Sequence, residues 1–180
     1  MIAVDPSGCA GERDKRSDEI GIVAVGLGHD GMGRILEDAT GHYSPDGWAH
    51  KALELYDRWK GDKIVAETNF GGAMVESTIR TARKRAPIKL LNASRGKVQR
   101  AEPVAALYAQ GKVRHVGHFA ELERQQCLFS TSGYVGPRSP DHADAAIWGL
   151  TELMLEPAPG EGLFEYYGGL HAEEAAERAA

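Results

Sequence analysis

The sequence is poor in cysteine and has no long hydrophobic run. Its two cysteines, Cys9 and Cys127, are too few for a disulfide framework, and we expect both to be reduced, half-buried thiols. No apolar run approaches the roughly 18 residues that a membrane span needs. Residues 1–5 have the character of a strand rather than of a signal peptide. With no internal repeat either, the sequence predicts a compact cytosolic domain without a membrane segment.

The charge of the chain is unevenly distributed. The formal net charge of −5 argues against a protein coated with basic residues for nucleic-acid binding. Residues 80–114 are the exception, because only Glu102 is acidic there and ten residues are basic: Arg80, Arg83, Lys84, Arg85, Lys89, Arg95, Lys97, Arg100, Lys112 and Arg114. Such a segment is either a solvated surface or a contact for a polyanion. Binding of a polyanion depends more on the local charge of the contacting surface than on the net charge of the whole chain.

The pattern of apolar residues predicts an α/β domain with a mixed central sheet flanked by helices. Three strands joined by short links, at 1–5, 20–27 and 34–39, predict an antiparallel meander. Helices then alternate with strands, which predicts right-handed crossovers between parallel strands. The first helix is expected to follow a start signal at 44–47 and to run to about residue 59. Further helices are expected at 73–85, 100–110, 119–129 and 141–155, strands at 63–67, 88–92 and 113–116, and a loop at 130–140. The domain should cover residues 1–156, followed at 157–180 by a linker and a mobile or partner-docking tail.

Four carboxylates lie at the ends of core elements, where acidic residues are unfavourable. Asp5 ends the first strand, which should be central, and Glu67 ends the strand after the first crossover. Asp141 and Asp144 are three residues apart and share one face of the first turn of the last helix. That helix is almost entirely apolar, so it should be buried on most sides.

The four carboxylates together suit divalent metal ions. Mg²⁺ and Mn²⁺ prefer hard oxygen ligands, and two such ions about 4 Å apart can clamp a phosphodiester. Each residue also has a simpler interpretation: Asp5 could begin a turn, Glu67 could be an ordinary strand exit, and Asp141 could be a helix N-cap. Asp144 is harder to dismiss, because an ionised side chain among alanines, Ile147 and Trp148 needs a partner or a metal.

Several segments in this order resemble one family. They are VDPSG (4–8), AETNFGG (66–72), KVQRAEPV (97–104), LYAQGKV (107–113), LERQQC (122–127) and SPDHADA (139–145). They are similar to the RNase H-like nuclease fold, in the branch of RuvC-like resolvases, and more closely to the C-terminal nuclease domain of the large terminase subunit of tailed bacteriophages. The resemblance runs from about residue 1 to residue 155.

The resemblance implies roles for individual residues. Asp5, Glu67, Asp141 and Asp144 would be the catalytic ligands of two Mg²⁺ or Mn²⁺ ions. Lys97 and Arg100 would face the DNA backbone. Arg95 and Lys84 are either further phosphate contacts or solvated charges. His142 could assist the chemistry, but we expect it on the helix surface.

The resemblance also implies a setting, the packaging of phage DNA in the host cell cytoplasm. The domain would hydrolyse phosphodiester bonds of double-stranded viral DNA and work with a terminase ATPase motor, a portal and a small terminase subunit. The chain has no GxxxxGK[ST] phosphate loop, and its paired glycines at 26–33 fall at a turn between strands. We therefore expect the motor to be on another domain or chain. The alternatives are a Holliday-junction resolvase or related RNase H-like nuclease, and a non-catalytic docking module of the packaging machine.

Overall fold

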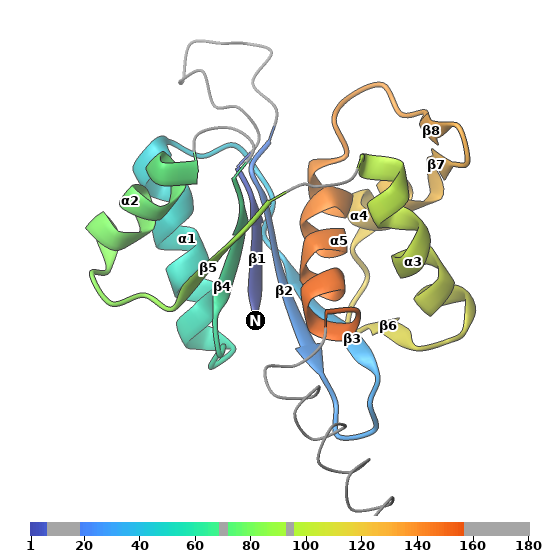
Figure 1. Cartoon of the computed structure of the whole chain (residues 1–180), viewed down its shortest axis with the longest axis horizontal. Coiled ribbons are helices and arrows are strands. Elements are labelled where there is room, and N and C mark those ends of the chain that lie inside the picture. The colour runs from blue at the N-terminus through green and yellow to red at the C-terminus, as the bar shows by residue number, and fades with distance from the viewer. Residues whose placement is uncertain (7–18, 69–71, 93–95, 157–180) are drawn as a thin grey trace, which may run out of the picture.

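A six-stranded mixed sheet forms the centre of the molecule (Figure 1). The computed structural model describes residues 1–6, 19–68, 72–92 and 96–156. The strand order is β5-β4-β1-β2-β3-β6. The strands are β1 (Ile2–Asp5), β2 (Gly21–Leu27), β3 (Gly33–Asp38), β4 (Ile64–Glu67), β5 (Ile88–Leu91) and β6 (Val113–His115). The predicted mixed sheet is therefore confirmed, with β1 in its interior.

The pairing of the strands combines a meander with parallel additions on both sides. β1, β2 and β3 pair antiparallel in sequence order, as predicted. β4 pairs parallel with β1, β5 parallel with β4, and β6 parallel with β3. In this register Asp5 lies opposite Gly21 of β2, and Val4 lies opposite Ala66 of β4. The last residues of β1 and β4 therefore lie side by side at one end of the sheet.

Helices cover the two faces of the sheet in separate groups (Figure 1). α1 (Pro45–Arg58) and α2 (Gly72–Ala82) lie on one face, and α3 (Lys97–Ala109), α4 (Ala120–Cys127) and α5 (Asp141–Met154) lie on the other. Successive residues of a strand point to opposite faces of the sheet and so belong to different apolar clusters. In β1, Ile2 and Val4 belong to the cluster on one face and Ala3 to the cluster on the other. α5 is buried on most sides, as predicted, because the sheet, α3 and α4 enclose it.

Several details differ from the sequence-based expectations. The loop predicted at 130–140 contains part of a small hairpin of β7 (Phe129–Ser130) and β8 (Gly133–Tyr134), whose two-residue strands are too short to show alternation. α3 begins at Lys97 rather than at Arg100, because its N-cap, Gly96, provides no side-chain signal. Cys127 is exposed rather than half-buried, while Cys9 and the tail at 157–180 lie outside the described residues.

A carboxylate near the end of α5 ties this helix to two strands. The side chain of Glu152 is 3% exposed and pairs with Lys63, which precedes β4, and with Lys89 of β5, whose Nζ is 2.8 Å from Oε1. Burial alone would raise the pKa of Glu152, but hydrogen bonds from the two lysines outweigh it and leave the pKa below its ordinary value. The contact joins α5 to the end of the sheet opposite Asp5.

This contact predicts a pH-dependent loss of stability in Glu152→Gln. Because the folded-state pKa of Glu152 is depressed, its contribution is present above the unfolded-state pKa and is lost as pH falls through the folded-state pKa. We expect Glu152→Gln to lower the free energy of unfolding by about 1 to 2 kcal/mol at pH 7, with the difference shrinking below about pH 4. Urea unfolding at several pH values measures it, and the exposed Glu156→Gln is the control. An equal loss at pH 7 and pH 3 would contradict the charge-based explanation.

Candidate active site

Three elements bring carboxylates to one end of the sheet. Asp5 ends β1, Glu67 ends the parallel neighbour β4, and Asp141 and Asp144 lie in the first turn of α5. Asp5, Asp141 and Asp144 are only 5%, 3% and 2% exposed, whereas Glu67 is partly exposed. The structure therefore places the four predicted site residues in one region, although they come from distant parts of the sequence.

The carboxylates repel one another. Burial raises the pKa of Asp5 well above its ordinary value, and the negative charges of Asp144, Glu67 and Asp141 raise it further. The pKa of Asp144 is also raised, mainly by burial, and Glu67 adds to the shift. Several buried charges of the same sign destabilise the folded protein, and clusters of this kind are typical of functional sites.

Lys97 provides a positive charge inside this cluster. Its Nζ donates a hydrogen bond to Oδ2 of Asp144 at 2.5 Å, although the lysine side chain is 49% exposed. Burial would lower the pKa of Lys97, but the charge and hydrogen bond of Asp144, with contributions from Asp5 and Asp141, raise it. Lys97 was expected to face DNA, and it lies directly beside the carboxylates at the start of α3.

A second set of side-chain contacts connects Glu67 to α5 and α3. The indole nitrogen of Trp148 donates to Oε2 of Glu67 at 3.2 Å, and the guanidinium carbon of Arg100 lies 4.3 Å from the centre of a Trp148 ring. Sequence analysis did not assign Trp148 to the site. Its spacing of four residues from Asp144 places both on one helix face, which is the signal that could have found it.

The basic segment is divided between the two ends of the sheet. Lys97 and Arg100 lie at the carboxylate end, on α3. Lys84 is exposed between α2 and β5, and β5 begins beside Ile64, so Lys84 lies at the other end. The structure thus does not bring Lys84 to the carboxylates, and Arg95 lies outside the described residues.

The donor chemistry fits a hard divalent cation, but the described side chains are not closed around one. Carboxylate oxygens are the ligands that Mg²⁺ and Mn²⁺ prefer, and their mutual repulsion would be relieved by a cation. Within the described ranges, no three histidine, cysteine, aspartate or glutamate side chains are grouped as metal ligands. The ammonium group of Lys97 is the cation that contacts Asp144 in this arrangement.

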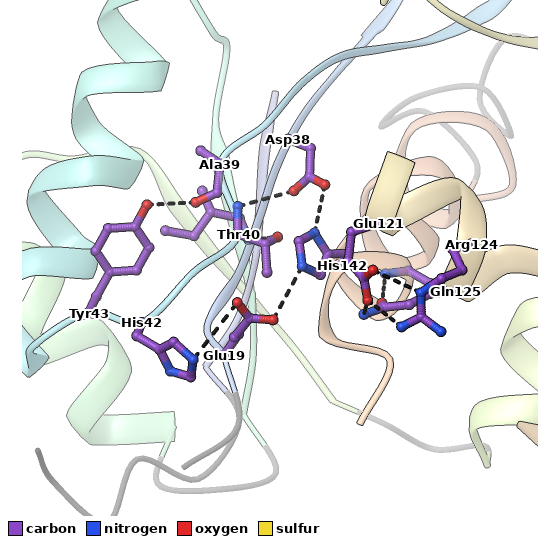
Figure 2. A network of polar contacts seen from close by, with 12 residues as sticks. Glu19, Asp38, Ala39, Thr40, His42, Tyr43, Glu121, Arg124, Gln125 and His142 are labelled. Atoms are coloured by element: carbon purple, nitrogen blue, oxygen red, sulfur yellow. Dashed lines mark hydrogen bonds and ion pairs between the residues drawn. The ribbon is translucent and has the colours of Figure 1, made fainter. Parts of the chain in front are cut away.

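In the first turn of α5, one expectation is wrong and one alternative interpretation does not hold. His142 is not a surface residue: it is 8% exposed, its Nδ1 lies 2.7 Å from Oδ2 of Asp38, and its Nε2 lies 3.3 Å from Oε2 of Glu19 (Figure 2). Burial would lower the pKa of His142, but the two carboxylates raise it. Asp141 is not the N-cap either, because Pro140 occupies that position and α5 has no side-chain cap of its own.

A glycine allows this turn to approach the sheet closely. A Cβ atom on Gly21 would lie 2.3 Å from the carbonyl oxygen of Asp141 and 2.9 Å from Cβ of Ala145. Because Gly21 is the register partner of Asp5, this close approach of α5 to β2 lies directly beside the end of β1. Sequence analysis did not identify Gly21, since a glycine at the start of a strand has many ordinary explanations.

Comparison with known proteins shows the family and the fold of this chain. The family model that describes the terminase RNaseH-like domain matches residues 2–153 of this chain. Among solved structures, the chain is similar to the large terminase nuclease of thermophilic phage G20c, with a TM-score of 0.60 and 15% identity over 84% of this chain and 81% of that chain. No curated protein sequence matches significantly.

Two resolvases are more distant in structure. Thermus thermophilus RuvC, in complex with a Holliday junction substrate, gives a TM-score of 0.45 at 16% identity over 84% of this chain and 92% of that chain. The yeast mitochondrial Holliday junction resolvase Ydc2 gives a TM-score of 0.45 at 15% identity over 81% and 76%. The RNase H-like fold of this chain is shown by the family match and by the likeness to the G20c structure.

The contact at Gly21 predicts a large effect for the smallest substitution. Gly21→Ala should lower the free energy of unfolding by about 2 to 4 kcal/mol, because its new methyl group meets backbone that cannot rotate away. Gly26→Ala in the same strand is the matched control, since its Cβ would meet only the side chain of Leu36 at 3.1 Å. Thermal or urea unfolding compares them, and equal stability of the two variants would contradict the close approach.

Proposed function

This chain belongs to the family of terminase RNaseH-like domains, and from that premise we propose that it is a divalent-metal-dependent endonuclease domain. Its substrate is double-stranded DNA, and its reaction is hydrolysis of phosphodiester bonds during packaging of a viral genome. The observation that carries this proposal is the gathering of Asp5, Asp141 and Asp144, all buried, beside Glu67 at the ends of two parallel strands. A fold that only needed stability would not place four carboxylates there.

The residues divide the work by position. Asp5, Glu67, Asp141 and Asp144 would hold Mg²⁺ or Mn²⁺ ions, preferably two. When bound, such ions supply an acidified water and stabilise charge on the phosphodiester oxygens. Trp148 holds the Glu67 carboxylate through its indole N–H, and Lys97 holds that of Asp144. Buried surroundings limit the water around these groups and strengthen their electrostatic interactions.

The DNA surface that we propose lies on α3, next to the carboxylates. Lys97 and Arg100 begin this helix and both adjoin the site, so their charges suit the phosphates that flank a cleaved bond. The stacking of Arg100 on Trp148 keeps its guanidinium group near Glu67. Lys84 is left out of this surface because it lies at the opposite end of the sheet.

We propose partners that are typical of this family. A terminase ATPase motor on another domain or chain would deliver DNA to this site, and a portal and a small terminase subunit would complete the complex in the host cytoplasm. The described residues contain no helix long and apolar enough to cross a membrane.

Neutralising Asp5 tests the proposal through two opposite effects. Because the pKa of Asp5 is raised by burial and repulsion, Asp5→Asn should raise the free energy of unfolding of the metal-free protein by about 1 kcal/mol. The same change, and Asp144→Asn, should reduce Mn²⁺-dependent cleavage of plasmid DNA at least about 100-fold, since a metal ligand is worth several kcal/mol. Asp57→Asn, which removes an exposed partner of Arg83, is the control. Folded variants that cleave at the wild-type rate would overturn the proposal.

The proposed DNA surface predicts a contrast between two basic residues. Arg100→Ala should weaken binding to a DNA duplex roughly 3- to 10-fold and lower the slope of log Kd against log salt by about 0.9, as loss of one phosphate contact does. Lys84→Ala removes the same charge at the other end of the sheet and should leave both quantities unchanged. Fluorescence anisotropy in Ca²⁺, at several salt concentrations, measures them. A larger effect of Lys84→Ala would place the DNA elsewhere.

A further inference from the structure

The first turn of α5 receives a hydrogen bond partner from a different helix. Gln125 of α4 is 3% exposed, and its Oε1 accepts a hydrogen bond from the backbone N–H of Ala143 at 3.1 Å. Its Nε2 donates to Oε1 of Glu121, one turn earlier on α4, at 3.2 Å. A glutamine amide whose two ends are both engaged has a defined orientation.

This contact fills a need that α5 cannot meet by itself. The first N–H groups of a helix have no partner within the helix and are usually satisfied by a capping side chain. The N-cap of α5 is Pro140, which offers no side-chain acceptor. Gln125 therefore does the work of a cap from outside the helix. The amide that it fixes, of Ala143, lies between Asp141 and Asp144, the two candidate ligands on this turn.

The same turn is anchored on its other flank. His142 lies between Asp38 at the end of β3 and Glu19, which precedes β2, as Figure 2 shows together with Gln125 and Glu121. Gly21 brings the backbone of Asp141 against β2. Sheet and helix contacts thus hold the turn from two directions, and Gln125 is the only one of these side chains that comes from α4 among the described contacts.

We propose that Gln125 is a positioning residue that sets the placement of Asp141 and Asp144 for metal binding. The inference rests on the proposed metal-dependent nuclease function and adds a role for a residue that touches neither metal nor substrate. Outer residues that orient ligands of a metal typically change its affinity 10- to 100-fold when they are removed. The segment LERQQC, which contains Gln125, thereby acquires a function in the site.

The test compares two adjacent glutamines in the full chain. Gln125→Ala should weaken Mn²⁺ binding, measured by calorimetry, by about 10-fold or more. The half-saturating Mn²⁺ concentration for plasmid cleavage should rise by the same factor, while the rate at saturating Mn²⁺ stays within about 3-fold. Gln126→Ala is the matched control, because Gln126 also donates a partly buried hydrogen bond, to the hydroxyl of Tyr108 at 3.1 Å on α3, and does not cap the first turn of α5.

A rescue variant separates positioning from folding. In the combined Glu121→Gln/Gln125→Glu change, the donor and acceptor of this pair are exchanged and the acceptor for Ala143 is kept, so Mn²⁺ affinity should return to within about 3-fold of wild type. Gln125→Glu alone should bind Mn²⁺ poorly, because two carboxylates would face each other. If Gln125→Ala does not fold, the comparison of Gln125→Glu with the exchanged pair provides the test, and equal Mn²⁺ affinity of these two variants would overturn the positioning role.

The possible negative results distinguish failure of the positioning role from failure of the nuclease proposal. If wild type binds Mn²⁺ and a folded Gln125→Ala binds it equally well, the positioning role is overturned while the nuclease proposal stands. An equal loss in Gln126→Ala, or a folded exchanged pair that binds as weakly as Gln125→Ala, also overturns the positioning role. A wild-type protein that neither binds Mn²⁺ nor cleaves DNA overturns the nuclease proposal and this inference with it.

Discussion

Repulsion between buried carboxylates is the constraint on which this structure depends. Asp5 has a raised pKa because it is buried beside Asp144 and Glu67, and the metal-free protein carries that unfavourable energy at one end of its sheet. The surrounding contacts reduce the cost: Lys97 pairs with Asp144, and Trp148 donates to Glu67. Such an arrangement is stable only if the remaining structure is rigid enough to prevent the charges from separating.

The rest of the fold provides that rigidity. Apolar clusters on both faces of the sheet hold β1 in the interior, so Asp5 cannot move toward water. α5 is fixed at both ends, by Glu152 with its two lysines at one end and by Gly21, Gln125 and His142 at the other. The helix that carries two of the carboxylates is therefore also the most enclosed helix of the domain, which links core packing directly to the geometry of the proposed site.

The distribution of basic residues shows how the fold separates two uses of charge. Residues 80–114 form one basic block in the sequence, yet Arg83 pairs with Asp57, Lys89 pairs with Glu152, and Lys97 enters the carboxylate cluster. Among the described residues of this block, those at the start of α3 combine positive charge with proximity to the carboxylates. In the proposed function, DNA would be met beside the site rather than along the whole segment, and the net charge of −5 would discourage other modes of binding.

The sequence by itself determined the mixed α/β sheet, the order of its elements and the candidate carboxylates, because periodicity and acidic residues at strand ends are local signals. Only the tertiary structure decided how these residues meet. The opposite placements of Lys97 and Lys84, the burial of His142, and the approach of α5 to Gly21 all depend on contacts between segments far apart in the chain. Gln125 is the clearest case: its sequence context suggests an ordinary helix residue, and only the packing of α4 against α5 places its amide oxygen at the N–H of Ala143. Local pattern specifies what each element is, whereas the distance between side chains on different elements is set by the packing of the whole domain.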